Sequence, residues 1–293
     1  MQEGPSLARP PAFIHIWQHQ PTGNAARNVM DFGPGAENKR KREHAQRNSR
    51  AFAIDGPLVG SFRQFFATSP VACPYVSGRA ERKLIVELGA VGGAAFYDEL
   101  SRAGFRRSHR FAYRPACRGC SSCVPVRIAV EHFRHTRSTR RVRNANRDIC
   151  GSLVAARATP EQFRLFSAYQ RTRHGDSDMA SMRYGDYRGM VEDTPVRTAL
   201  AEFRDGCGDL VAASLIDLLD DGVSAVYSYY DPLQPKRSLG IWSVLWLVEE
   251  CRRRKQPFVY LGYWIAESPK MAYKGRFPAL ERLDRGGWTV SAR

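Results

Sequence analysis

The sequence predicts an α+β protein with two folded parts, a cysteine-containing N-terminal domain and a C-terminal domain in which strands alternate with helices. Apolar runs of strand length and amphipathic helical stretches follow one another along the second half of the chain. With 43% of its 293 residues hydrophobic, the chain has enough apolar side chains to form a core. No stretch approaches the ~20 apolar residues of a membrane span, which excludes a transmembrane protein.

The first 54 residues differ from the rest of the chain. Pro and Gly are scattered through them, and they show no sustained amphipathic pattern. We interpret residues 1–54 as a disordered extension, or as an overlong start with Met30 as the true initiator, and a nucleic-acid-binding arm is the alternative. The N-terminal domain is expected over residues 55–150. Its predicted elements are a strand, a short helix and a second strand, at 83–88, 94–103 and 124–130.

The C-terminal domain is expected over residues 151–293 and opens with a short strand at 152–156. Thr159 can then cap a helix that has Pro160 at its first position, and Gln162 can close a capping box. The helix should end at about Arg173, before a glycine.

A meander of strands follows this helix, with turns that contain glycine. After the meander, a helix with an apolar face leads to a buried strand. The predicted strands are 196–203, 210–218 and 223–230, the helix is 238–254, and the last strand is 258–261. Antiparallel strands followed by a helical crossover match the GNAT-like acyltransferase fold.

The charge of the chain points to nucleic acid. A formal charge of +16 indicates a polyanionic partner. Thirteen arginines fall in residues 102–147, where Glu131 is the only carboxylate. Like charges at helical spacing repel, so this segment favours phosphate binding over a solvated face. The predicted tRNA-contacting residues within it are Arg140, Arg141 and Arg143.

Cysteines form a second cluster of interest. The run Cys117, Cys120, Cys123 has C-x₂-C-x₂-C spacing, and Cys73 lies 44 residues upstream. Four thiolates can complete a site for zinc or hold an iron–sulfur cluster, and reduced thiols without metal are the alternative. Seven cysteines in all, an odd number, argue against a secreted disulfide scaffold. We therefore expect a cytoplasmic protein.

Several motifs together resemble a known family. They are Cys-Pro-Tyr-Val-Ser-Gly-Arg at 73–79, Tyr-Tyr-Asp-Pro at 229–232, Arg-Ser-Leu-Gly at 237–240, Tyr-Leu-Gly-Tyr-Trp-Ile at 260–265 and Lys-Met-Ala-Tyr-Lys at 270–274. The chain resembles the aminoacyl-tRNA–protein transferases of the N-degron pathway, and the bacterial aspartate/glutamate leucyltransferases most closely. The resemblance runs from about residue 61 to residue 288.

The resemblance implies an aminoacyltransferase. Leucine would move from leucyl-tRNA to the α-amine of a protein that begins with Asp or Glu and would mark that protein for degradation; arginyl-tRNA is the alternative donor. The ester is already activated, so we expect no protein nucleophile and no required cofactor. The expected partners are aminoacyl-tRNA and the acceptor protein, with no membrane, and the expected state is a monomer.

The donor side of the site is predicted around the second helix of the C-terminal domain. Arg237, Ser238 and Gly240 resemble the turn by which GNAT enzymes hold a pyrophosphate, and they would suit the 3′ end of tRNA. An ordinary cap at Ser238 is the alternative. Stacking on the terminal adenosine and lining the side-chain pocket is the role predicted for Tyr229, Tyr230, Tyr263 and Trp264, with core packing as the alternative for each.

The predicted catalytic residues are Asp231 and Tyr230. Asp231 would orient or deprotonate the attacking amine, or bind the α-ammonium of the aminoacyl group, and a turn before proline is the alternative. The acceptor's acidic side chain needs a cation. Its candidate partners are Arg79, Arg82, Lys270 and Lys274, of which the two lysines are expected i, i+4 on a short helix.

Two rival functions fit parts of the pattern. A non-catalytic RNA-binding protein with a zinc knuckle would account for the arginines and the cysteines, but it would not need the aromatic-rich second half. A coenzyme-A-dependent acetyltransferase would share the fold. Against it stand the arginine segment and Trp242, which replaces the last small residue of the pyrophosphate turn.

Overall fold

The computed structural model describes residues 63–89, 92–175 and 177–290. The extension predicted over residues 1–54 lies outside the described residues. The N-terminal part forms a four-stranded antiparallel sheet in the order β1-β4-β6-β5 and a two-stranded one, β2-β3. The strands are β1 (Phe65–Ala67), β2 (Val71–Ala72), β3 (Ala80–Glu81), β4 (Lys83–Glu87), β5 (Arg106–Ser108) and β6 (Phe111–Pro115), and helix α1 (Gly93–Arg102) lies between β4 and β5.

The larger sheet has eight strands in the order β14-β13-β7-β12-β11-β10-β9-β8. Its strands are β7 (Val124–Ala129), β8 (Cys150–Ala155), β9 (Thr198–Arg204), β10 (Leu210–Leu219), β11 (Gly222–Tyr230), β12 (Phe258–Trp264), β13 (Leu280–Asp284) and β14 (Gly287–Val290). The predicted meander is confirmed as β9-β10-β11, and β12 then pairs in parallel with β11. Strand β7 belongs to this sheet, so the sheet takes strands from both sides of residue 150.

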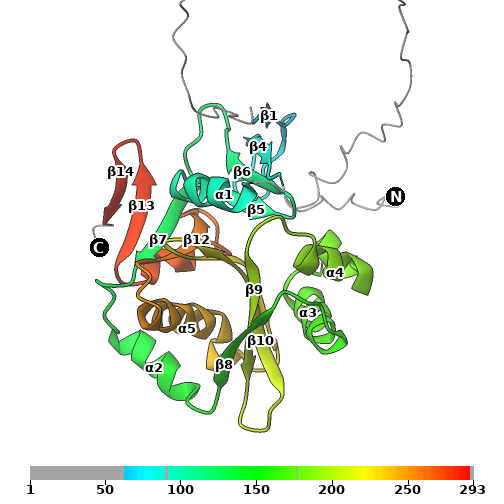
Figure 1. Ribbon diagram of the computed structural model, residues 1–293, viewed down its shortest axis with the longest axis vertical. Helices are drawn as coiled ribbons and strands as arrows, with labels where there is room; N and C mark the ends of the chain where they lie inside the picture. Colours follow the sequence, from blue (N-terminus) through cyan, green and yellow to red (C-terminus); the bar gives the residue numbers. More distant parts are fainter. Residues whose placement is uncertain (1–62, 90–91, 176, 291–293) are drawn as a thin grey trace, which may run out of the picture. The chain divides into compact units, whose positions relative to one another are not determined.

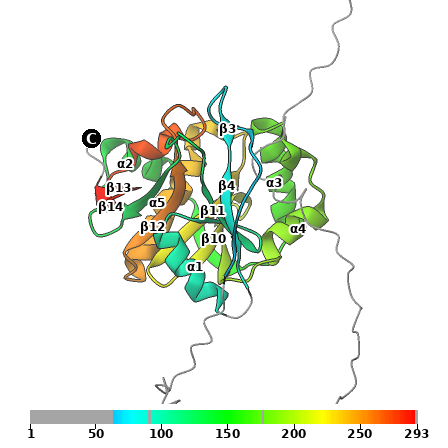
Figure 2. The ribbon, with the colours of Figure 1, turned by 90° about the horizontal axis from the view of Figure 1, so that it is seen from above.

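Helices cover both faces of the large sheet (Figure 1). Helix α5 (Leu239–Arg253) lies on one face with α2 (Arg137–Ala145) beside it, and α3 (Pro160–Arg173) and α4 (Tyr184–Glu192) lie on the other. The strand alternation explains both layers: Ala199, Ala201 and Phe203 of β9 pack with the α5 side, whereas Leu200 packs with the α3 side. The four-stranded sheet, from here on the small sheet, lies over one end of the large sheet (Figure 1), and the view from above looks down onto its strand β4 (Figure 2).

The local signals for α3 are confirmed. The Thr159 side chain accepts a hydrogen bond from the backbone N–H of Gln162, and the Gln162 side chain accepts one from the N–H of Thr159. Pro160 occupies the first turn, and the helix ends at Arg173. This capping box satisfies two backbone donors that a helix start otherwise leaves unpaired.

Other elements were not predicted or differ from the prediction. The sequence pattern did not identify α4, β5, β6, β13 and β14. The short helix expected to carry both lysines is the 3₁₀ helix η3 (Ala272–Arg276), and Lys270 precedes it. The remaining 3₁₀ turns are η1 (Asp178–Ser181) and η2 (Pro235–Arg237). Among the described residues, none of the helices has the length and apolar character needed to cross a bilayer.

Candidate functional site

A gap between β11 and β12 is the central feature of the large sheet. The two strands pair only over residues 222–224 and 258–260, although β11 continues to Tyr230 and β12 to Trp264. Their carboxyl-terminal parts therefore separate. The side chain of Arg106, from β5 of the small sheet, enters the gap and donates hydrogen bonds to backbone carbonyls of both strands.

Two neighbouring tyrosines end β11, and the rings of both contact side chains of α3. Tyr230 is half-buried, and its ring packs edge-on against Tyr169 of α3 with 4.8 Å between centroids. Tyr229 is 1% exposed, and its hydroxyl lies 2.6 Å from that of Tyr187. The ring of Tyr229 therefore has no free face for the predicted stacking and belongs to the core. Tyr169 also contacts His174, the cap residue of α3, at 5.5 Å.

Asp231 directly follows these tyrosines and forms a turn. Its carboxylate accepts hydrogen bonds from the backbone N–H of Leu233 at 2.9 Å and from Nε2 of Gln234 at 2.8 Å. The backbone N–H of Asp231 donates to the carbonyl of Val211. These contacts correspond to the turn-forming alternative, and a catalytic role for Asp231 stays a prediction.

The loop before α5 brings a backbone turn close to Tyr230. Ser238 adopts a left-handed conformation at φ 53°, is exposed, and makes no side-chain capping bond. Gly240 lies in the first turn of α5, where a Cβ would come within 2.9 Å of the Tyr230 ring. Glycine is therefore needed for this close approach. The start of the helix and the aromatic ring at the end of β11 form one continuous surface.

Arg237 in the same loop fastens the basic helix α2 to the start of α5. Its Nε donates to Asn146 at 3.0 Å, one guanidinium nitrogen donates to Gln234, and the other pairs with Asp148. Asn146 in turn donates to the carbonyl of Arg237 at 2.8 Å. The guanidinium predicted to contact tRNA is thus engaged with protein partners, and its observed contacts are structural.

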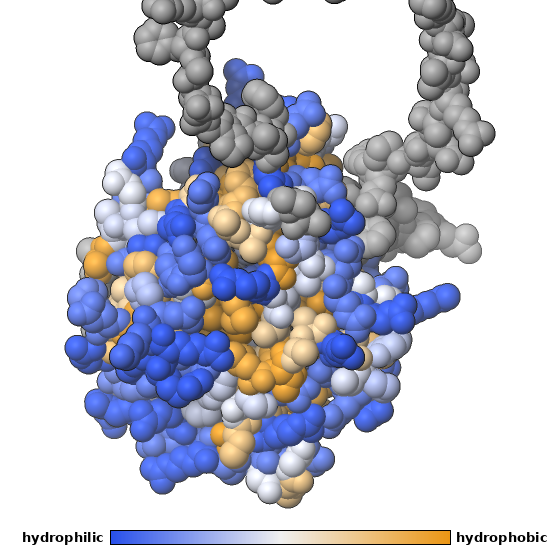
Figure 3. Space-filling view, in the orientation of Figure 1, coloured by the Kyte–Doolittle hydropathy of each residue, from blue (hydrophilic) through white to orange (hydrophobic). Residues whose placement is uncertain are grey.

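Helix α2 presents the predicted arginines to solvent. Arg137, Arg140, Arg141 and Arg143 are exposed, and among the described residues none of them has a carboxylate within ion-pair distance. Arginine in the first turn of a helix opposes the helix dipole, so this charge does not serve the stability of α2. Hydrophilic side chains cover the face over α2 (Figure 3). The helix has the chemistry of a phosphate-binding surface.

Two more predicted residues, Tyr263 and Trp264, end β12, and a third, Lys274 of η3, bonds to this strand. Tyr263 is 6% exposed, and its hydroxyl donates a hydrogen bond to the carbonyl of Gly104, so its ring lies in the core rather than in a stacking position. Trp264 is half-buried with the guanidinium of Arg282 4.1 Å above its ring. The ammonium of Lys274 is buried and donates to the carbonyl of Tyr263 at 2.9 Å.

The other acceptor candidates lie elsewhere. Lys270 is exposed near His174, and its charge, after the effect of burial, helps to lower the pKa of that imidazole. Arg79 and Arg82 are exposed beside the cysteine cluster, where the backbone N–H of Arg82 donates to Cys117 at 3.4 Å. The four predicted acceptor residues are therefore not brought together at one point.

The four predicted metal ligands do lie near one another. Burial raises the pKa of the Cys123 thiol to about 12, and the neighbouring Cys73, Cys117 and Cys120 add to this effect. All are free thiols. Across the described part of the chain, however, no group of three or more His, Cys, Asp or Glu side chains is arranged to hold a metal ion. The thiols converge without forming a coordination site in this arrangement.

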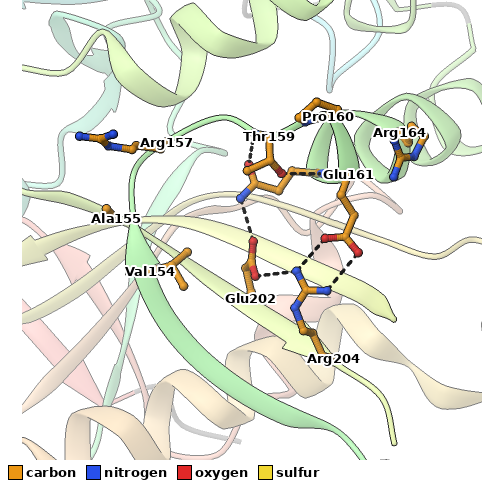
Figure 4. Close-up of a pocket in the computed structure, with 10 residues that line it drawn as sticks. Val154, Ala155, Arg157, Thr159, Pro160, Glu161, Arg164, Glu202 and Arg204 are labelled. Carbon is orange, nitrogen blue, oxygen red and sulfur yellow. Dashed lines mark hydrogen bonds and ion pairs between the residues drawn. The ribbon is translucent and has the colours of Figure 1, made fainter. Parts of the chain in front are cut away.

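A pocket of about 610 Å³ lies at the start of α3, beside the edge strand β8. Figure 4 shows Arg204 between Glu161 and Glu202 in this pocket. Glu202 also accepts a hydrogen bond from Gln162 at 2.8 Å. The two carboxylates and the single guanidinium are bonded to one another and together carry one net negative charge, and Arg157 and Arg164 also line the pocket.

Sequence reasoning missed Arg106, which lies in the gap itself. It is one of thirteen arginines in its segment, and only the pairing of β5 within the small sheet aims it at β11 and β12. The residue that makes room for it, Gly262, also lies far away in the sequence. A long-range contact of this kind leaves no local signal.

The comparisons define the class of protein. The model described as arginine-tRNA-protein transferase, N terminus, matches residues 71–141, and the one described as arginine-tRNA-protein transferase, C terminus, matches residues 161–284. The chain is thus an aminoacyltransferase of the kind that uses charged tRNA. Residue 150, the predicted domain boundary, lies between the two matched segments.

Relatives narrow the class further. An aspartate/glutamate leucyltransferase of Paramagnetospirillum magneticum is 55% identical over 224 residues, covering 76% of this chain and 92% of the relative. One from Rhodospirillum rubrum is 55% identical over 225 residues, with the same two coverages. The chain belongs to the aspartate/glutamate leucyltransferase family. Among solved structures, L-PGS from Bacillus licheniformis is 11% identical with a TM-score of 0.37 over 49% of this chain and 47% of that one, a similarity too low to bear on the chemistry.

Proposed function

We propose that this chain transfers leucine from leucyl-tRNA to the N-terminal α-amine of proteins that begin with Asp or Glu, and so marks them for degradation. The observation that carries the proposal is the placement of α2. Its unpaired arginines form a phosphate-binding surface, and Asn146 at its end is bonded to the loop that opens α5. A tRNA held on α2 would have the gap between β11 and β12 close by.

The arrangement of the C-terminal half supports a GNAT-like acyltransferase domain over residues 151–293. An antiparallel meander, a helical crossover and a parallel strand that separates from its neighbour follow in that order. We propose this domain as the catalytic one and residues 55–150 as the N-terminal domain. Four of the seven cysteines form the cluster in this N-terminal domain. We propose that the cluster is the characteristic feature of the domain.

The reaction needs no covalent enzyme intermediate, because the ester of the charged tRNA is already activated. The amine nitrogen attacks the ester carbonyl, the bond from that carbon to the 3′ oxygen of the tRNA breaks, and the proton that the amine loses ends on this oxygen as the 3′-hydroxyl. Holding the two reactants at near-attack distance is worth up to about 7–11 kcal/mol. Backbone donors at the start of α5 suit the developing oxyanion. Transfer therefore needs no cofactor in this proposal.

The cysteine cluster supports a separate, structural proposal. Cys123 and the three thiols near it have the donor chemistry of a zinc or iron–sulfur site, although their present arrangement does not meet a coordination geometry. We propose that a metal, where bound, is held by these four thiols and organises the N-terminal part. Metal analysis of anaerobically purified protein tests this: a stoichiometric metal lost on replacing Cys120 with Ser supports it, and metal-free active protein contradicts it.

Location and assembly are also proposals. Free thiols and the use of charged tRNA suit the reducing cytoplasm. We propose that the protein works there as a monomer. Sedimentation of the purified protein at several concentrations would reveal a dimer if this proposal is wrong.

The function is tested with both donors side by side. The protein is incubated with radiolabelled leucyl-tRNA or arginyl-tRNA and with peptides that begin with Asp, Glu or Ala. The proposal expects leucine on the Asp and Glu peptides and none on the Ala peptide. Arginine transfer alone would change the donor, and label on none of the peptides would reject the function.

A further inference from the structure

Arg106 joins the two sheets at the gap. Its guanidinium donates from one nitrogen to the carbonyls of Ala225 at 2.9 Å and Val226 at 2.8 Å on β11, and from the other to Leu261 at 3.4 Å on β12. A guanidinium has five N–H donors, so two of them are not used in these bonds. Arg106 is half-buried, which leaves part of the group open to a ligand.

The backbone of β12 is shaped around this side chain. Gly262 adopts φ +73°, and a Cβ at that position would lie 1.7 Å from a guanidinium nitrogen of Arg106. Only glycine accepts both the left-handed backbone and the contact. The position of the guanidinium is therefore built into the strand.

The charge on Arg106 is not neutralised. The adjacent arginine, Arg107, is fully buried and bonded to Asp217 at 2.7 Å and 2.8 Å. Arg106 has no carboxylate within ion-pair distance in the described part of the chain, and neither has Lys274. Lys274 donates to the carbonyl of Tyr263, two residues along β12 from the Leu261 carbonyl that Arg106 bonds. Burial and the charge of Arg106 lower the pKa of Lys274 well below its usual value.

Three tyrosines interact electrostatically with Arg106. Burial raises the pKa of Tyr75, Tyr113 and Tyr273, and the positive charge of Arg106 opposes that rise in each case. The tyrosines come from three separate parts of the chain, and Tyr113 lies directly across the β5–β6 pairing from Arg106. Since buried charges in proteins are normally paired, a half-buried cation without a carboxylate partner in the described part of the chain suits an anion supplied from outside.

We propose that Arg106, with Lys274 beside it, binds the side-chain carboxylate of the acceptor's N-terminal Asp or Glu. Tyr230, with the start of α5 beside it, ends β11 four residues beyond Val226, and we place the ester of the charged tRNA there. This inference rests on the proposed function. It assigns the selection of acidic acceptors to Arg106, with Lys274 as its neighbour, rather than to the exposed Arg79, Arg82 and Lys270.

The experiment measures selectivity, which a purely structural role would not change. Single-turnover leucine transfer is followed with paired peptides that begin with Glu or Gln, for the wild type and for Arg106→Gln. Loss of one charge-assisted contact should lower kcat/KM for the Glu peptide by roughly 10–100-fold, chiefly through KM, and leave the Gln peptide nearly unchanged. Arg110→Gln is the matched control, because Arg110 is exposed in an ion pair with Glu87.

Further variants keep the test decisive. Lys274→Met should reduce the same preference, and Gly262→Ala should do so while the guanidinium is retained, because it displaces Arg106. If Arg106→Gln does not fold, the Lys274→Met preference decides. The inference is overturned if Arg106→Gln and Lys274→Met, or the one of them that folds, keep the wild-type preference for Glu over Gln. A wild type that transfers leucine to no acidic peptide would instead reject the proposed function, so the two failures are distinguishable.

Discussion

Replacing Asp217 with Asn is expected to destabilise the fold strongly, because Asp217 pairs with a buried cation. Both side chains of the Arg107–Asp217 pair are 0% exposed. Two hydrogen bonds of 2.7 Å and 2.8 Å join them, and Thr198 donates a third to Asp217 at 2.8 Å. The pair ties β5 of the small sheet to β10 of the large one.

The magnitude follows from burial. Removing one partner of a buried ion pair leaves an uncompensated charge and costs about 3–5 kcal/mol. In urea, with a slope of about 2–3 kcal/mol/M, the unfolding midpoint should fall by about 1–2.5 M. Replacing Arg107 with Met and Asp217 with Leu together should cost far less, because no charge is then stranded.

A matched surface pair provides the control. Arg102 and Asp220 lie at the same 2.7 Å separation, but their side chains are 40% and 54% exposed. Asp220→Asn should therefore cost at most about 1 kcal/mol. Urea unfolding followed by circular dichroism measures all variants. The reasoning is refuted if Asp217→Asn costs no more than Asp220→Asn.

The remaining predictions concern tRNA, catalysis and pH. Neutralising the basic surface of α2 should weaken tRNA binding and flatten its salt dependence, and an unchanged salt slope would place the tRNA elsewhere; the residues to replace are Arg140, Arg141 and Arg143. Asp231→Asn retains an oxygen for the turn, so it should slow transfer in single-turnover assays while tRNA affinity is kept; unchanged turnover would assign the residue to the turn alone. Burial and neighbouring cations lower the pKa of His174 below 6.5, so the unfolded chain takes up this proton first and the free energy of unfolding should fall as the pH drops below 6.5. His174→Gln should make that fall shallower, and an equal slope would contradict the assignment.

Local patterns predicted the scaffold well because their causes are local. The capping box of Thr159 and Gln162, and the alternation of strand residues such as Leu200, depend on neighbours within a few positions. Helix α4 went unrecognised: its start has no Ser, Thr, Asn or Asp at the capping position, where Arg183 stands. The order of the meander, the helix α5 and the strand β12 came from the same short-range signals.

The site was harder to predict because its residues meet through long-range contacts. Tyr229 and Tyr230 look alike in sequence, yet the fold buries one and leaves the other half-exposed. Arg237 was expected at the tRNA, but the fold places it between Asn146 and Asp148. Arg106 could be recognised only once β5, β11 and β12 were placed together.

The central claim is that the chain makes a peptide bond between leucine and an acidic N-terminus. Mass spectrometry of a peptide beginning with Asp, after incubation with leucyl-tRNA and the purified protein, tests this claim most directly. We expect a leucine attached to the α-amine of that peptide and much less on the otherwise identical peptide beginning with Asn. An unmodified Asp peptide, or equal modification of both peptides, would contradict it.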